Sequence, residues 1–246
     1  MTKGIKLHVW GDYALFTRPE MKAERVSYDI MTPSAARGIL EAIYWKPEIS
    51  FVVDRIHVLK TVQFTSVRRN EVSDKAVNPS FAAIKGQDVN AMGIFIEEKR
   101  RQRASLILRD VAYVIEAHFD VLGCRMDKDG PVLAEADCAA KHISIFNRRA
   151  RSGQAFQQPY LGCREFPAHF ALIEDDNFPP SSLDESERNH NYGFILHDFI
   201  FTEDPKGKII ESNTGKKLTA HARFFRAKME NGAVAIPNIY SEEVFS

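Results

Sequence analysis

The stretch Thr32–Pro47, TPSAARGILEAIYWKP, decides how the first half of the chain folds. Thr32 followed by Pro33 predicts a helix start, because threonine caps free backbone amides and proline suits the first helical position. Pro47 then ends the helix. The apolar residues between them have the spacing i, i+3, i+4 and i+7 of one buried helix face: Ala36, Ile39, Leu40 and Ile43.

Strand-like patterns surround this helix. Ile5–Trp10 precedes it and alternates apolar with polar residues, whereas Ile49–Phe64 follows it with runs of β-branched and aromatic residues. Val111–Phe119 alternates most regularly, with one apolar face and one face that carries polar residues. A second helix is expected over Ala139–Gly153, and Tyr160–Phe170 can supply another strand. The order is therefore strand, helix, strands, helix, strand.

This order predicts an α+β fold with the β-α-β-β-α-β pattern of a ferredoxin-like domain, which RNA-recognition modules of the RRM type share. An inserted β-hairpin is also expected. Its strands are Ala91–Ile96 and Ala104–Leu108, and the charged run EEKRRQR forms a basic tip between them. Fold alone does not give function, so the chemistry has to come from particular residues.

The composition changes after the proline- and acid-rich stretch DDNFPPSSLDESE at 175–187. Beyond it, the runs YGFILHDFIF and HARFFRAKM and a turn at Glu230–Gly232 predict a small antiparallel sheet. We therefore expect two domains, a ferredoxin-like domain over 1–180 and a small β-sheet subdomain over 190–246.

The overall composition is that of an ordinary globular protein, with 44% hydrophobic residues, 27% charged residues and no net charge. No apolar run approaches the roughly 20 residues of a membrane helix, and the N-terminus does not resemble a signal peptide. Three cysteines lack a C-x-x-C spacing, which argues against a disulfide framework and a cysteine zinc site: Cys124, Cys138 and Cys163. These features predict a cytoplasmic protein with no membrane partner.

Basic residues gather in patches although the net charge is zero. The charged residues of 139–169 are mostly basic and those of 171–190 mostly acidic, which can give a neutral protein a basic face. Each run alone is explained as a solvated surface, but cations interleaved with aromatic residues predict a single-stranded RNA surface. The residues expected to contact RNA are Arg18, Lys22, Arg25, Arg37, Arg68, Arg69, Arg148, Arg149 and Arg151.

Lys141-His142, in the second predicted helix, is the first candidate for catalysis. Periodicity alone favours a structural interpretation, a boundary histidine beside a solvated basic face. The functional alternative is that both residues point at an RNA phosphate, because histidine moves protons near neutral pH and lysine stabilises phosphorane charge. Tyr44 is the second candidate. It is either packed for structure or orients an attacking hydroxyl.

A metal site is not expected. His190, His197 and Asp198 lie close in sequence, but their spacing matches no metal-ligand signature. The chain also lacks the phosphate loop G-x-x-x-x-G-K-[ST], the nucleophile elbow G-x-S-x-G and the zinc motif H-E-x-x-H. The sequence therefore predicts no metal and no cofactor, and argues against nucleotide hydrolysis and serine chemistry.

Three long runs carry a family resemblance: GDYALFTRPEMKAERVSYDIMTPSAARGILEAIYWKP, KHISIFNRRARSGQAFQQPYLGCREFPAHF and HARFFRAKMENG. They resemble the CRISPR-associated Cas5d family of subtype I-C systems, a branch of the repeat-associated RAMP superfamily. The likeness covers most of the chain and is weakest over 73–102. It implies a ferredoxin-like domain with a β-rich C-terminal extension.

The resemblance also implies an activity, metal-independent cleavage of precursor CRISPR RNA at the base of the repeat hairpin. Family members then stay with the product and with the other subunits of the type I-C surveillance complex. The family's catalytic tyrosine and Lys-His pair fall on Tyr44, Lys141 and His142. Such cleavage proceeds by attack of the 2′-hydroxyl, which gives a 2′,3′-cyclic phosphate and a 5′-hydroxyl. We assign His142 as general base or acid, Lys141 as charge stabiliser and Tyr44 as the positioning group.

Two alternatives stay open. The protein can be a non-catalytic scaffold that caps the 5′ handle of the guide RNA, as members of the wider family are. A further hypothesis adds metal-dependent activity, or activity on or binding of duplex DNA, through the basic runs Lys99–Arg103 and Arg148–Arg151. Retention of all three candidate catalytic residues favours the enzyme.

Overall fold

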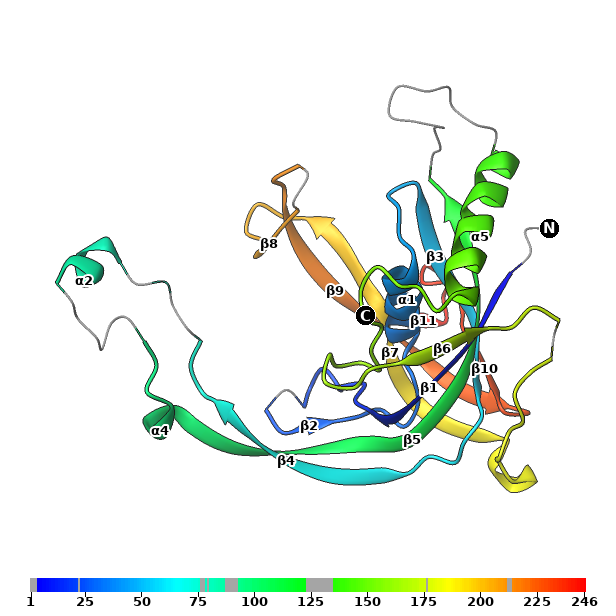
Figure 1. The fold of residues 1–246 in the computed structure, drawn as a ribbon, viewed down its shortest axis with the longest axis horizontal. Helices are drawn as coiled ribbons and strands as arrows, with labels where there is room; N and C mark the ends of the chain where they lie inside the picture. Colours follow the sequence, from blue (N-terminus) through cyan, green and yellow to red (C-terminus); the bar gives the residue numbers. More distant parts are fainter. Residues whose placement is uncertain are drawn as a thin grey trace.

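The structure is a computed structural model that describes residues 4–21, 23–75, 78, 80–86, 93–122, 135–175, 177–211 and 214–246. It is a mixed α/β structure with a large antiparallel sheet and few helices among the described residues (Figure 1).

Four strands form the centre of the sheet in the order β3-β5-β1-β6, and each neighbouring pair is antiparallel. They are β1 (Ile5–Ala14), β3 (Ile49–Val58), β5 (Arg100–Val121) and β6 (His169–Leu172). Along the chain, helix α1 (Pro33–Ile43) connects β1 to β3, and helix α5 (Glu135–Arg151) connects β5 to β6. A two-residue strand, β2 (Arg25–Val26), pairs with β5 in parallel.

Both predicted helices are confirmed. The side chain of Thr32 accepts a hydrogen bond from the amide of Ala35 at 3.3 Å, so the predicted cap of α1 is present. Helix α5 begins at Glu135, earlier than expected, and it ends near Gly153, whose φ of 64° suits a glycine after a helix.

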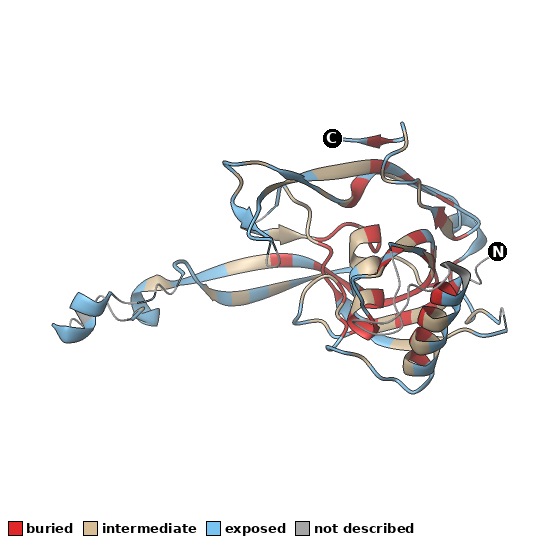
Figure 2. Cartoon of the chain, turned by 90° about the horizontal axis from the view of Figure 1, so that it is seen from above, coloured by how far each residue is buried: buried red, intermediate tan, exposed pale blue. Residues whose placement is uncertain are grey.

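The core lies where α1 and α5 cover one face of the sheet (Figure 2). The alternation predicted for Val111–Phe119 is confirmed, because Tyr113, Ile115 and Phe119 are buried on this face. Glu116 and His118 lie on the opposite face. There the side chain of Glu116 contacts His57, and that of His118 contacts Asp54.

A long two-stranded arm leaves the body of the protein (Figure 1). Strand β4 (Phe64–Val72) pairs along the first half of β5, and the short helices α2 (Phe81–Lys85) and α4 (Ile96–Lys99) lie near the end of the arm. The insertion is thus a hairpin, but the predicted strand Ala91–Ile96 is wrong. Residues 93–95 are not in a strand and α4 starts at Ile96, whereas residues 91–92 lie outside the described residues. Strand β5 pairs instead with β4, a partner about thirty residues away in sequence that no local pattern could indicate.

The C-terminal strands extend the same sheet. Strands β7 (His190–Glu203) and β9 (Lys217–Glu230) form an antiparallel pair, and β8 (Ile209–Ile210) and β11 (Val244–Phe245) add to β9. Strand β10 (Ala233–Ala235) pairs with both β9 and β3, which makes the sheet continuous. The predicted turn is confirmed, with positive φ at Asn231 and Gly232. The proposed division into 1–180 and 190–246 stays a prediction, and it would separate two hydrogen-bonded parts of one sheet.

The expectations about membrane helices and about cysteines can be compared with the described residues. No helix among them is long and apolar enough to cross a membrane. Cys163 has a free thiol, whereas Cys138 is disulfide-bonded, a bond that the argument against a disulfide framework did not anticipate. An odd number of cysteines excludes complete pairing but not a single bond.

Candidate active site

Two of the predicted catalytic residues, 98 positions apart in sequence, form a hydrogen-bonded pair. The hydroxyl of Tyr44 lies 2.8 Å from Nδ1 of His142, and the two ring centroids are 5.8 Å apart. Tyr44 is 3% exposed and His142 is 1% exposed, so both side chains lie in the protein interior. The structure therefore brings the end of α1 and the first half of α5 together at this pair.

The local backbone explains how Tyr44 reaches α5. Its amide still bonds the carbonyl of Leu40 at 3.1 Å, but its φ of −154° and ψ of 124° are extended, so Tyr44 is the C-cap of α1. The side chain leaves the direction of the apolar stripe and points to the neighbouring helix. On α5, His142 packs edge-on against Phe119 of the central strand at 6.2 Å. His142 is thus a buried residue, and its placement at the boundary of a solvated face is wrong.

Burial sets the protonation state of the pair. Desolvation, followed by the charge of Lys141, lowers the pKa of His142, so its imidazole is neutral at neutral pH. Desolvation also raises the pKa of Tyr44, so its hydroxyl stays protonated. A neutral imidazole has one N–H and one acceptor nitrogen. Either member of the pair can therefore donate the shared hydrogen bond.

Lys141 precedes His142 on α5 and is half-exposed, as expected for a residue on the solvated side of the helix. Its ammonium charge acts on the pKa of His142, which places it within electrostatic reach of the imidazole. Arg149, one of the predicted RNA contacts, lies 5.3 Å over the ring of Tyr44 and donates a hydrogen bond to the carbonyl of Ile43 at 3.1 Å. Arg149 thus supports the tyrosine from the second helix.

Glu48 is a residue of this site that the sequence analysis missed. Its Oε2 atom is buried and accepts no hydrogen bond from any described residue. Its charge raises the pKa of both Tyr44 and His142. A lone Glu after the helix gives no local signal, because only the fold brings it to the pair.

Most of the predicted RNA contacts away from α5 are ion-paired within the chain. Arg18 pairs with Asp29 at 3.0 Å, and Arg37 holds Asp198 of β7 with two hydrogen bonds of 2.7 and 3.1 Å. Arg25 and Arg69 both face Glu165, at 3.9 and 2.6 Å. Arg68 is exposed on β4 without an ion pair to any described residue, and Lys22 lies outside the described residues.

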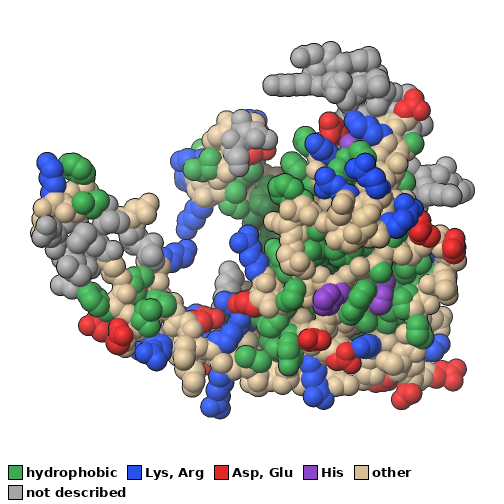
Figure 3. All heavy atoms as spheres, viewed as in Figure 1, with side chains coloured by type: hydrophobic (Ala, Val, Ile, Leu, Met, Phe, Trp, Pro, Cys, Tyr) green, Lys and Arg blue, Asp and Glu red, His purple; other side chains and the backbone are tan. Residues whose placement is uncertain are grey.

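The three arginines at the end of α5 have different surroundings. Arg148 is exposed and makes no ion pair with a described residue, Arg149 packs on Tyr44, and Arg151 pairs with Glu174. Figure 3 shows basic side chains gathered over the part of the molecule where α1 and α5 meet. This basic surface borders the buried pair, and the RNA contacts assigned to it stay predictions.

The described residues contain no group of three or more His, Cys, Asp or Glu side chains that could hold a metal ion. His197 donates from Nε2 to the carbonyl of Pro237 at 2.8 Å, and Asp198 is held by Arg37. These contacts use Nε2 of His197 and both carboxylate oxygens of Asp198.

The family model Cas5d, described as CRISPR-associated protein (Cas_Cas5), matches residues 4–237. This chain belongs to the Cas5d family. Two curated Cas5d relatives match over nearly their whole length, and both are named CRISPR pre-crRNA endoribonuclease Cas5d. The protein of Mannheimia succiniciproducens is 50% identical over 246 residues, which cover 99% of each chain. That of Thermus thermophilus is 37% identical and covers 98% of this chain and 94% of its own.

Two solved structures share the fold of this Cas5d-family chain, each at 22% identity. The functionally uncharacterized protein SMU1763c from Streptococcus mutans has a TM-score of 0.62 and covers 100% of this chain and 98% of its own. A structure described as a CRISPR-associated protein has a TM-score of 0.59 and covers 100% and 97%. At this identity they support the fold alone.

Proposed function

We propose that this protein is an endoribonuclease that cleaves precursor CRISPR RNA within the repeat. The observation that carries the proposal is the buried hydrogen bond of 2.8 Å between Tyr44 and His142, beside Lys141 and a basic surface. The two relatives named as pre-crRNA endoribonucleases, at 50% and 37% identity over nearly the whole chain, support it.

The proposed reaction needs only side chains of the chain. When Nδ1–H of His142 donates to the hydroxyl of Tyr44, Nε2 carries the lone pair of the neutral imidazole. We assign Nε2 to accept the proton of a ribose 2′-hydroxyl, a role that requires bound RNA to reach the buried ring. The 2′-oxygen then bonds to its neighbouring phosphorus, and the bond from phosphorus to the 5′-oxygen breaks. The leaving oxygen takes up a proton from water or from the imidazolium that the first transfer formed on His142, which gives a 2′,3′-cyclic phosphate and a 5′-hydroxyl. Lys141 is assigned to stabilise the phosphorane charge.

The finer fold assignment belongs to the same proposal. The strand order β6-β1-β5-β3, with α1 after β1 and α5 after β5, supports a ferredoxin-like domain over 1–180. The strands over 190–246 form its β-sheet extension. We further propose that the protein acts in the cytoplasm and stays with its cleaved RNA and the other subunits of the type I-C surveillance complex.

The test is cleavage of a repeat hairpin RNA in EDTA, under single-turnover conditions. We expect the wild type to cut and His142→Ala to lose about 10²–10⁴-fold in rate while RNA binding survives. His118→Ala, on the opposite face of β5, is the matched control and should cut normally. Cleavage by His142→Ala at the wild-type rate would refute the assignment.

The scaffold alternative is separated by a repeat RNA with a 2′-deoxy substitution at the cleavage position. An enzyme of the proposed mechanism binds this RNA and does not cut it, whereas a scaffold cuts neither the substituted nor the natural RNA. Competition by duplex DNA at matched salt tests the remaining alternative, because phosphate contacts make both affinities salt-dependent.

A further inference from the structure

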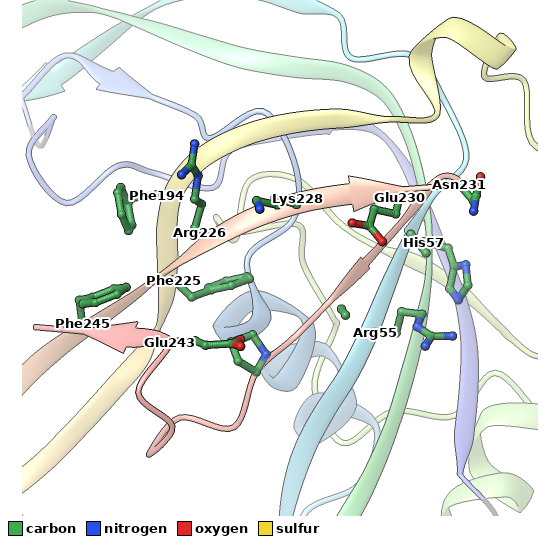
Figure 4. Close-up of a pocket in the computed structure, with 13 residues that line it drawn as sticks. Arg55, His57, Phe194, Phe225, Arg226, Lys228, Glu230, Asn231, Glu243 and Phe245 are labelled. Atoms are coloured by element: carbon green, nitrogen blue, oxygen red, sulfur yellow. The ribbon is translucent and has the colours of Figure 1, made fainter.

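A groove lies on the C-terminal strands, on the face of β9 that points away from α1 (Figure 4). It encloses about 850 Å³. Four strands contribute the side chains that matter here: Arg55 of β3, Phe194 of β7, Arg226 and Lys228 of β9, and Phe245 of β11. None of these residues belongs to the Tyr44–His142 pair, so the groove is a separate site.

Two phenylalanines at one end of the groove are open to solvent. Phe194 is 58% exposed and Phe245 is 51% exposed, and their rings meet edge to face with centroids 5.8 Å apart. Phe194 lies directly opposite Arg226 in the antiparallel ladder. An exposed aromatic pair next to a guanidinium presents both a stacking surface and a cation to a ligand.

The cations of the groove differ from the arginines of the first part of the chain that are ion-paired. Arg55, Arg226 and Lys228 make no ion pair with any described residue, whereas Arg18, Arg25, Arg37 and Arg69 are each held by a carboxylate. Two carboxylates, Glu230 and Glu243, also line the groove, so it offers acceptors as well as donors. A positive charge without an internal partner is available for a phosphate.

The groove continues along the sheet. A second cavity of about 250 Å³ shares His57 and Asn231 with the first, and adds Phe178 and Arg188. Aromatic and basic side chains therefore follow one another along an elongated track. Single-stranded nucleic acids are bound by this combination, because bases stack on aromatic rings while cations follow the phosphates.

We propose that this groove binds the unpaired RNA strand next to the repeat hairpin. The inference rests on the proposed endoribonuclease function and adds a second RNA contact to it. Bases stack on Phe194 and Phe245, and phosphates meet Arg226, Lys228 and Arg55. Because α1 lies on the other face of the sheet, the hairpin at the active site and the strand in the groove occupy different faces of the protein.

The test compares a 2′-deoxy-blocked repeat hairpin with the same hairpin extended by about 12 unpaired nucleotides on its 5′ or its 3′ side. Fluorescence anisotropy measures the affinities, and the extension alone serves as a third probe. We expect one extension to tighten wild-type binding about tenfold. Phe194→Ala with Phe245→Ala should abolish this gain, and Lys228→Glu should reduce it and its salt dependence.

The matched controls are Phe201→Ala and Lys217→Glu, exposed residues of β7 and β9 outside the groove, which should keep the gain. All groove variants should cut the unextended hairpin at the wild-type rate, so loss of that activity reports on the proposed function instead. Circular dichroism confirms folding of these surface variants. The proposal is overturned if no extension improves wild-type binding, or if the gain persists in the groove variants. The latter result would instead favour a protein partner for this mixed-charge surface.

Discussion

The Tyr44–His142 pair and the groove beside Phe194 use similar kinds of side chains in opposite ways. In the pair, a ring hydroxyl and an imidazole are buried and satisfy each other at 2.8 Å. In the groove, aromatic rings and cations are exposed and have no ion pair with a described residue. A buried, fixed geometry suits proton transfer, whereas an open row of rings and charges suits the binding of a flexible strand.

The arginines near β2 and β4 are intermediate between the buried pair and the exposed cations of the groove. Arg25 and Arg69 are half-buried and share the carboxylate of Glu165, and Arg25 also pairs with Glu71, so they join elements of the chain before any RNA arrives. A basic residue in the sequence is therefore not yet a phosphate contact. What distinguishes the two roles is the presence of an internal acidic partner.

The largest effect on the cleavage rate is expected when both residues of the Tyr44–His142 pair are substituted. Tyr44→Phe combined with His142→Ala should lose about the same 10²–10⁴-fold in cleavage rate as His142→Ala alone, because both side chains act on one proton. Single-turnover rates of the wild type, both single variants and the double variant measure this coupling. Independent, multiplicative losses would show that the hydrogen bond does not join the two residues into one catalytic unit.

Tyr44→Phe alone keeps the ring and removes the hydroxyl. The substitution removes the hydrogen bond of the buried His142 Nδ1 to Tyr44, which should lower the free energy of unfolding by about 1–3 kcal/mol. The substitution should also slow cleavage, because the imidazole is less well oriented. Denaturant unfolding and cleavage rates report the two losses. Tyr240→Phe, at an 80% exposed tyrosine, is the control. A stable variant that cuts at full rate would contradict the importance of the pair.

Arg37→Ala tests whether an ion-paired arginine is structural. Asp198 would lose its bidentate partner, and because Arg37 is about one-third exposed the cost should be about 2 kcal/mol, below that of a fully buried pair. RNA affinity should change little. Arg148→Ala, at an exposed residue of α5, should do the reverse and weaken RNA binding without loss of stability. The sharpest contradiction would be an Arg37→Ala protein of normal stability that binds RNA poorly.

The smallest effect is expected from Glu48→Gln. Burial and Lys141 lower the pKa of His142 below its ordinary value of 6.5, and the charge of Glu48 opposes this shift. Activity that needs neutral His142 should therefore be full above pH 6.5 and be lost as the pH falls through the lowered pKa. The stability that neutral His142 contributes follows the same direction, since the unfolded chain takes up the proton first.

Removing the charge of Glu48 should lower the pKa of His142 further and move the acidic limb of the cleavage profile to lower pH. The profile of kcat/KM against pH measures this shift, with Glu98→Gln on the arm as a matched control. A shift to higher pH would show that Glu48 does not act on the imidazole through its charge.

The local patterns of the sequence were sufficient for the elements that surround the site. Thr32-Pro33 and the apolar spacing predicted α1, and the alternation of Val111–Phe119 predicted which face of β5 meets the helices. The candidate residues Tyr44 and His142 rested on the family resemblance, because periodicity alone favoured structural roles for both. Their hydrogen bond joins residues 98 positions apart, a distance that no local pattern spans.

The failures share one cause, which is that partners distant in sequence decide them. The predicted strand of the arm is wrong because β5 pairs with β4 across an insertion, and the ion pairs of Arg37 and Arg69 could not be foreseen because their carboxylates lie on other elements. Glu48 was missed because its burial beside the pair follows from the turn between α1 and β3. Long-range pairing and internal neutralisation of charge appear only in the folded chain.

The three residues of β10 have a consequence for anyone who shortens this protein. Ala233–Ala235 cover one edge of β3 and join it to β9. A chain cut at residue 180 would expose that edge with its backbone amides and carbonyls unpaired, a template on which strands of other molecules can add. Such a fragment should aggregate rather than behave as an independent RNA-binding unit, so the C-terminal strands also protect the first part of the chain from self-association.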